Sequence, residues 1–237
     1  SRLLSLLNVK YVLTDKTQDV WIDDVYYDLE HTEPLGQVSF DDLPAFETTH
    51  LGLVSYLTGT AQIETGTPVA QVTVTSTLGT VISQTLRAGH DTAEGRYDDG
   101  PVAHVSARVG HRWRDEAGGY DYVTRLGFGQ RLEPAAILVR SMLPGMAFHL
   151  RGLSLIDEET RTSRSLSIHP AYRLVHSGDV KIYENLQVLP RAFVVPTARW
   201  AVDDAHALEL LRSPELDPSS ELVLIVAEVE AEGGSLA

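Results

Sequence analysis

Hydrophobic and polar residues alternate with a period of two through the middle of the chain. The alternation is clearest over 69–79 (VAQVTVTSTLG) and 80–89 (TVISQTLRAG). This pattern predicts strands with one buried face and one solvent face, and the STLGT segment between them supplies a glycine where a hairpin must reverse. We therefore predict an antiparallel strand pair over these two ranges. A second hairpin is predicted over 150–170, with the polar DEETRTS segment at its tip.

Short alternating runs separated by turn residues continue from about residue 40 to about residue 169, without a convincing helical pattern. They predict an antiparallel β-sandwich. The flanks differ, because an apolar helical turn leads into a strand at 9–14, and Asp203 or Asp204 is placed to cap a short helix that Pro214 ends.

The whole pattern predicts a mainly β protein in which an antiparallel β-sandwich is inserted in a small α/β unit. We expect the sandwich to cover 36–174. Both ends of the chain, 1–35 and 175–237, are expected to form the α/β unit.

Composition narrows the functional classes. The chain has 237 residues, of which 43% are hydrophobic, and this is enough for a real core. The formal net charge of −14 makes nucleic acid a poor partner. Because the chain has no cysteine, disulfides, thiolate zinc sites and a cysteine nucleophile are excluded. The first residue is not methionine and the chain opens in mid-pattern, so we expect it to be part of a longer protein.

No strong catalytic motif is present, since the sequence lacks a Gly-x-Ser-x-Gly elbow, a P-loop and a His-Glu-x-x-His pair. Three histidines between residues 90 and 111 would need spatial convergence to hold zinc. Glycoside hydrolysis needs two carboxylates facing each other across a cleft. Asp91 with Glu94, or Asp157 with Glu158, could provide such a pair, and a hydrolase stays an alternative.

The acidic residues after the first predicted hairpin could supply oxygen ligands to a structural Ca²⁺ ion. Asp91, Glu94 and Asp98 are the candidate ligands. The alternative is that these carboxylates cap turns and pair with neighbouring arginines, and no other cofactor is expected.

Aromatic and arginine side chains gather in the same region, which is the combination that sugar-binding surfaces use. An aromatic face packs on the apolar face of a sugar, and arginine donates to its hydroxyl groups. The candidate ligand-binding residues are Arg96, Tyr97, Arg112, Trp113 and Tyr120. The alternative is that the aromatic residues belong to an ordinary sandwich core.

Several segments together resemble the extramembrane C-terminal region of bacterial multi-spanning membrane proteins of the YfhO type, which look like GT-C glycosyltransferases. The segments are LLNVKYVLT, FDDLPAFETTHLGLVSYLTG, LRAGHDTAEGRYD, RGLSLIDEETRTS and VKIYENLQVLPRAFVV. The middle of the chain is similar to the galactose-binding-type jelly roll of many carbohydrate-binding modules, which implies that the predicted sandwich is a jelly roll of this type. Neither likeness carries a catalytic residue over to this chain.

The resemblance implies a non-catalytic domain on the extracytoplasmic face of a bacterial membrane, tethered to a parent transmembrane bundle. Its expected partner is a glycan or a lipid-linked sugar. A structural or assembly domain with no ligand of its own is the alternative from a different class.

Overall fold

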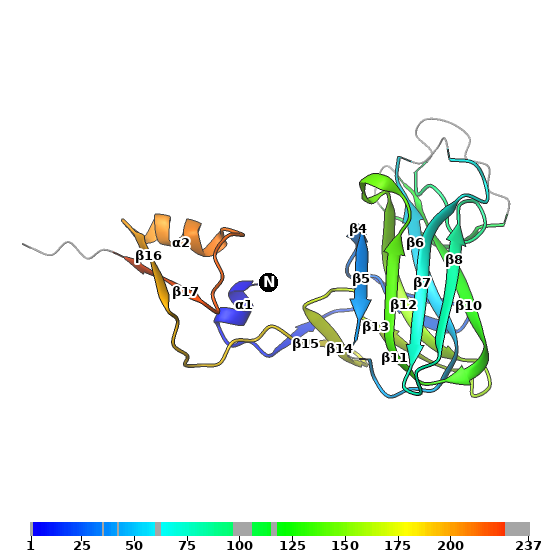
Figure 1. Ribbon diagram of the computed structural model, residues 1–237, viewed down its shortest axis with the longest axis horizontal. Coiled ribbons are helices and arrows are strands. Elements are labelled where there is room, and N and C mark those ends of the chain that lie inside the picture. Colours follow the sequence, from blue (N-terminus) through cyan, green and yellow to red (C-terminus); the bar gives the residue numbers. More distant parts are fainter. Residues whose placement is uncertain are drawn as a thin grey trace, which may run out of the picture. The chain divides into compact units, whose positions relative to one another are not determined.

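The computed structural model describes residues 2–34, 36–41, 43–59, 63–96, 106–114 and 118–225 (Figure 1). The chain divides into two compact units. We call residues 13–184 the sandwich unit, and we call residues 1–12 with 185–237 the terminal unit.

Two antiparallel sheets form the body of the sandwich unit, so the predicted mainly β sandwich is confirmed (Figure 1). The first sheet has six strands, in the order β13-β12-β6-β10-β9 with β4 beside β12. The second has four strands, in the order β5-β11-β7-β8. The jelly-roll topology stays a prediction.

The six-stranded sheet contains β4 (Glu33–Pro34), β6 (Thr48–Leu57), β9 (Arg108–Arg112), β10 (Tyr120–Leu132), β12 (Phe148–Asp157) and β13 (Thr162–Leu166). The four-stranded sheet contains β5 (Gln37–Phe40), β7 (Pro68–Ser76), β8 (Val81–Arg87) and β11 (Pro134–Ser141). A short 3-10 helix, η1 (Pro144–Met146), connects β11 to β12. Both predicted hairpins are confirmed, because β7 pairs with β8 and β12 pairs with β13.

The main core lies between the two sheets. Leu51, Leu53 and Leu155 from the six-stranded sheet and Val72 and Ile137 from the four-stranded sheet are among its members, each at most 2% exposed. Buried residues alternate with more exposed ones along much of these strands, and the same alternation of hydrophobic and polar residues is present in the sequence.

A hairpin of β2 (Asp19–Ile22) and β3 (Val25–Asp28) covers part of the outer face of the six-stranded sheet. Tyr27 from the hairpin packs with Val54 and Ile156 from the sheet in a second buried cluster. The sheet is therefore buried on both faces over part of its area. Where the β2–β3 hairpin ends, the outer face of the six-stranded sheet carries the polar residues of the cavity described below.

A fully buried lysine ties the hairpin to the strand β15 (Lys181–Asn185). The Nζ atom of Lys181 donates to Asp19 at 2.9 Å, to Asp28 at 3.1 Å and to Glu30 at 3.0 Å. Burial lowers the pKa of the lysine, but the three carboxylates outweigh that effect and raise its pKa overall. All three ammonium protons are thus satisfied by charged acceptors.

Both ends of the chain contribute to the terminal unit. Its parallel strands β16 (Thr197–Ala201) and β17 (Glu221–Ile225) are joined by α2 (Asp204–Arg212), and the short α1 (Arg2–Leu6) lies near the N-terminus. As predicted, Asp203 caps α2, because its carboxylate accepts the His206 N–H at 2.8 Å.

The observed division differs from the predicted boundaries at residues 35/36 and 174/175, which both lie inside the sandwich unit. The physical reason is that the β2–β3 hairpin packs on the six-stranded sheet and that Lys181 bonds to the hairpin. The remaining sheet has the order β1-β15-β14, with β1 (Tyr11–Thr14) and β14 (Tyr172–Ser177), and the division falls within β1 and β15.

Candidate functional site

A cavity of about 580 Å³ lies where the cover of the six-stranded sheet ends. We call it the arginine pocket. Its wall combines residues 17–20, at the start of the β2–β3 hairpin, with side chains from β6, β9, β12 and two loops. The lining residues are Thr17, Gln18, Asp19, Val20, Tyr56, Arg96, His111, Trp113, Arg114 and Arg151.

The indole of Trp113 forms an aromatic wall of the pocket. Its ring meets the Tyr56 ring edge-on, with 4.8 Å between centroids, and the Arg96 guanidinium lies 5.2 Å from its centroid. The indole packs against the backbone at Gly95 and Gly119, because a Cβ atom at either glycine would lie within 3 Å of it. These contacts fix the orientation of the indole.

A buried carboxylate lies behind the basic side of the pocket. Asp121 is fully buried, and its Oδ2 accepts a hydrogen bond from Nδ1 of His111 at 3.0 Å. His111 and Asp121 are cross-strand partners on β9 and β10. Nη1 of Arg151 lies 3.8 Å from the same carboxylate, while its Nη2 donates to the Leu29 carbonyl at 3.1 Å. The carboxylate therefore orients both His111 and Arg151.

Three polar atoms at this site are buried without a hydrogen-bond partner among the described residues: Nε1 of Trp113, Nε of Arg151 and Oδ1 of Asp121. Such atoms are rare in folded proteins, because desolvation without a partner costs about 1–3 kcal/mol each. Two of them are donors on side chains that line the pocket. Because these two atoms have almost no accessible surface, the donors that the pocket presents to a ligand are the guanidinium N–H groups of its lining arginines.

The lining of the pocket is positively charged although the chain as a whole is acidic. Among the lining residues that the structure describes, Arg96, Arg114 and Arg151 are accompanied by a single carboxylate, Asp19. That carboxylate already accepts hydrogen bonds from Lys181 and Tyr26. The arginine pocket thus suits ligands that present hydroxyl or anionic oxygens.

His149 supports the aromatic wall from the next strand. Its ring stacks on Tyr56, its partner across the strands, with 4.5 Å between centroids. Nε2 of His149 lies 2.8 Å from the Thr58 hydroxyl, and its Nδ1 is buried without a partner in the described structure. Burial lowers the pKa of His149 below its ordinary value of 6.5, outweighing the opposite effect of the Glu94 carboxylate.

This lowered pKa predicts a loss of stability in mild acid. At pH values between 6.5 and the lower pKa of the folded state, His149 binds a proton more readily in the unfolded chain than in the folded protein. The free energy of unfolding therefore falls as pH drops below about 6.5. Denaturant unfolding at pH 7 and pH 5 should show a smaller loss for His149→Gln than for the wild type. Equal losses in both proteins would contradict the assignment.

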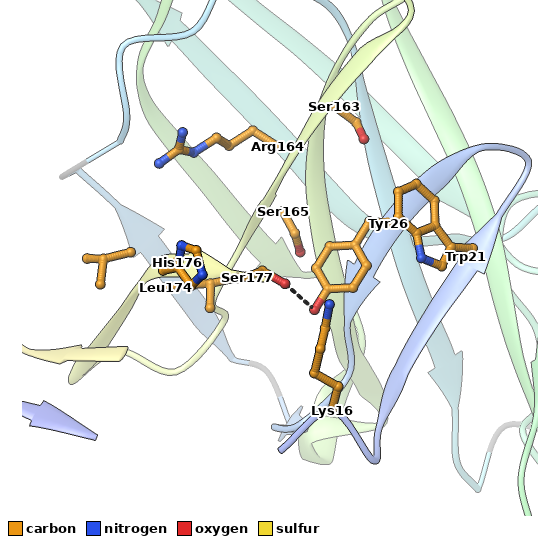
Figure 2. Close-up of a pocket in the computed structure, with 10 residues that line it drawn as sticks. Lys16, Trp21, Tyr26, Ser163, Arg164, Ser165, Leu174, His176 and Ser177 are labelled. Carbon is orange, nitrogen blue, oxygen red and sulfur yellow. Dashed lines mark hydrogen bonds between the residues drawn. The ribbon is translucent and has the colours of Figure 1, made fainter. Parts of the chain in front are cut away.

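A second cavity, of about 320 Å³, is lined in part by Lys16 and Trp21, which flank residues 17–20 in the sequence (Figure 2). We call it the Trp21 cleft, and Lys16, Trp21, Tyr26, Ser163, Arg164, Ser165, Leu174, Val175, His176 and Ser177 line it. Trp21 is 70% exposed and lies beside Tyr26, its cross-strand partner. Nothing in the sequence analysis singled out this cleft.

The structure brings together two of the five predicted ligand-binding residues. Arg96 and Trp113 line the arginine pocket. Arg112 lies over the Tyr120 ring, and Arg112 and Tyr120 are both outside the pocket lining. Successive side chains of a strand point to opposite faces, so Arg112 is directed away from the face shared by His111 and Trp113. Tyr97 lies outside the described residues.

Sequence reasoning missed Tyr56, Arg151 and the segment 17–20, which are far from Trp113 along the chain. His111 and Arg114 belong to a basic run, ARVGHRWR, in an otherwise acidic chain. Alternation within this run was the available signal, since it places His111 and Trp113 on one face.

The structure describes two of the three predicted calcium ligands, Asp91 and Glu94, so the predicted site is not tested. Asp91 closes a turn, because its Oδ2 accepts the Arg87 N–H at 2.8 Å, and Glu94 is buried at 6% exposure. Asp98 lies outside the described residues. Within the described ranges, no group of three or more histidine, aspartate or glutamate side chains is placed to hold a metal ion.

The carboxylates considered for hydrolysis at the β12–β13 turn are held by neighbouring groups. Asp157 accepts hydrogen bonds from Thr160, the Glu159 N–H and Arg131, and these interactions lower its pKa despite burial. A glycosidase acid needs a raised pKa. Glu158 lies beside Arg125 and His50. This turn therefore does not favour the hydrolase alternative.

Comparisons with protein-family models, with curated proteins and with solved structures find no match to this chain. Among the described residues, no helix is both long enough and apolar enough to span a membrane.

Proposed function

We propose that the sandwich unit is a non-catalytic glycan-binding domain whose binding site is the arginine pocket. One observation carries the proposal: the Trp113 indole, held in place by Tyr56, Gly95 and Gly119, stands among three arginines in a cavity of about 580 Å³. An aromatic face packs on the apolar C–H face of a pyranose ring, and arginine forks donate to its oxygens. A few directed polar groups around an apolar surface are typical of small-ligand sites.

The wider context of the proposal comes from the sequence resemblance. On that basis we propose that the domain lies on the extracytoplasmic face of a bacterial membrane, as part of a YfhO-type protein with a transmembrane bundle. There it would bind or position a glycan or the sugar of a lipid-linked donor.

A thermal-shift screen tests the proposed function. Mono- and oligosaccharides, each with calcium and with chelator, are added to the wild type, Trp113→Ala and Trp200→Ala. A bound sugar raises the melting temperature, because it stabilises only the folded state. We expect a shift for the wild type and for Trp200→Ala, whose indole is 63% exposed on β16, and no shift for Trp113→Ala.

The screen also separates the alternatives. A shift that survives in Trp113→Ala would place the site elsewhere and contradict the proposal. A folded wild type with no shift across the panel would favour a structural or assembly role.

A further inference from the structure

We propose that the Trp21 cleft is a second subsite for the glycan bound in the arginine pocket, and that this glycan is an acidic oligosaccharide. The inference rests on the proposed function and adds the class of ligand and its second point of contact.

Trp21 provides a fixed and exposed aromatic platform. Its indole is 70% exposed and its centroid lies 5.5 Å from that of the buried Tyr26. The Tyr26 hydroxyl donates to Asp19 at 2.6 Å and accepts from the Ser177 hydroxyl at 2.9 Å. Tyr26 is therefore held from two sides, and the platform that it supports loses little entropy when a sugar ring packs on it.

The rest of the cleft consists mainly of donors. Figure 2 shows Arg164, His176, Ser163 and Ser177 around the space beside the Tyr26 and Trp21 rings. Lys16 lies over the Tyr26 ring, 4.8 Å from its centroid. Of the described residues that line the cleft, none is a carboxylate.

The two cavities share one wall. In the short segment 16–21, Lys16 and Trp21 line the Trp21 cleft, whereas residues 17–20 line the arginine pocket. Asp19 lines the arginine pocket and accepts the hydroxyl of Tyr26, which lines the cleft. This hydrogen-bonded pair stands in the wall between the two cavities, and we infer that a chain of linked sugars that passes around segment 16–21 contacts both.

Charge selects the class of glycan. The two linings contain Arg96, Arg114, Arg151, Lys16 and Arg164, and among the described lining residues a single carboxylate, Asp19, opposes them. The chain carries a net charge of −14, so the rest of its surface repels anionic ligands and favours neutral or cationic ones. Cations that line two cavities on the same segment indicate an oligosaccharide that carries carboxylate or phosphate oxyanions.

The test is isothermal titration calorimetry with galacturonate disaccharide and hexasaccharide, with neutral galacto-oligosaccharides of the same lengths, and with galactose phosphate as the phosphate-bearing probe. The proteins are the wild type, Trp21→Ala, Trp113→Ala and the matched control Trp200→Ala. We expect the acidic hexasaccharide to bind more tightly than the disaccharide, and Trp21→Ala to weaken only the hexasaccharide, by about tenfold. Trp113→Ala should remove binding of both, and added salt should weaken both.

Each other outcome has a defined meaning. If Trp21→Ala binds the hexasaccharide like the wild type while Trp113→Ala does not bind, the second subsite is wrong and the proposed function stands. If neutral oligosaccharides bind as tightly as acidic ones, the acidic class is wrong. Tight binding of galactose phosphate alone identifies phosphate rather than carboxylate as the oxyanion. If Trp113→Ala binds every probe like the wild type, the proposed function fails as well.

Discussion

Replacing Lys181 with methionine is expected to lower the free energy of unfolding by about 3–5 kcal/mol. Lys181 is fully buried and its ammonium group lies within about 3 Å of the carboxylates of Asp19, Asp28 and Glu30. Methionine keeps most of the volume but leaves these carboxylates without their cation. Denaturant unfolding followed by far-UV circular dichroism measures the loss.

Two further variants separate charge from packing. Lys181→Met combined with Asp28→Asn removes one of the uncompensated charges, so this double variant should recover part of the stability. Lys16→Met is the matched control, because Lys16 is 30% exposed and lies 4.0 Å from Asp19, and its loss should cost less than about 1 kcal/mol. A single Lys181→Met variant as stable as Lys16→Met would show that the buried cluster contributes nothing to the fold.

Gly119→Ala is expected to weaken glycan binding at least about tenfold while leaving the sheets formed. A Cβ atom at Gly119 would lie 2.2 Å from Cε3 of Trp113. Its φ angle is not in the left-handed region, so alanine adds a steric clash rather than backbone strain. The indole must then move out of its place in the arginine pocket.

Gly36→Ala is the control for this substitution, because nothing lies within 4 Å of a Cβ atom at Gly36. Near-UV circular dichroism should change for Gly119→Ala and stay unchanged for Gly36→Ala, and calorimetry should show the same contrast in glycan affinity. Unchanged affinity in Gly119→Ala would mean that the orientation of Trp113 does not matter for binding.

Local patterns predicted the strands and hairpins well because strand alternation, turns and helix caps depend on residues that are close together in the sequence. Alternation over 69–89 and the glycine in its turn were sufficient for the β7–β8 pair, and Asp203 marked the start of α2. The short hairpin at 19–28 was missed. Its role depends on covering the outer face of a sheet whose strands come later in the sequence.

The candidate site could be predicted only in part for the same reason. Arg96 and Trp113 stood out because they lie in a cluster of charged and aromatic residues. Tyr56 and Arg151 reach the pocket through the pairing of β6 with β10 and β12, which joins segments far apart in the chain. Lys181 gave no signal, since a lysine in an alternating strand is normally exposed.

The most direct test of the proposed glycan site is an NMR titration of the indole N–H signals. The chain has three tryptophans, so three indole signals are expected. Trp113 lines the arginine pocket, Trp21 lines the cleft, and Trp200 lies on β16 in the terminal unit. Adding an acidic hexasaccharide should shift the Trp113 signal most and the Trp21 signal next, with Trp200 unchanged. A titration in which the Trp113 signal does not move would contradict the assignment of this pocket as a glycan-binding site.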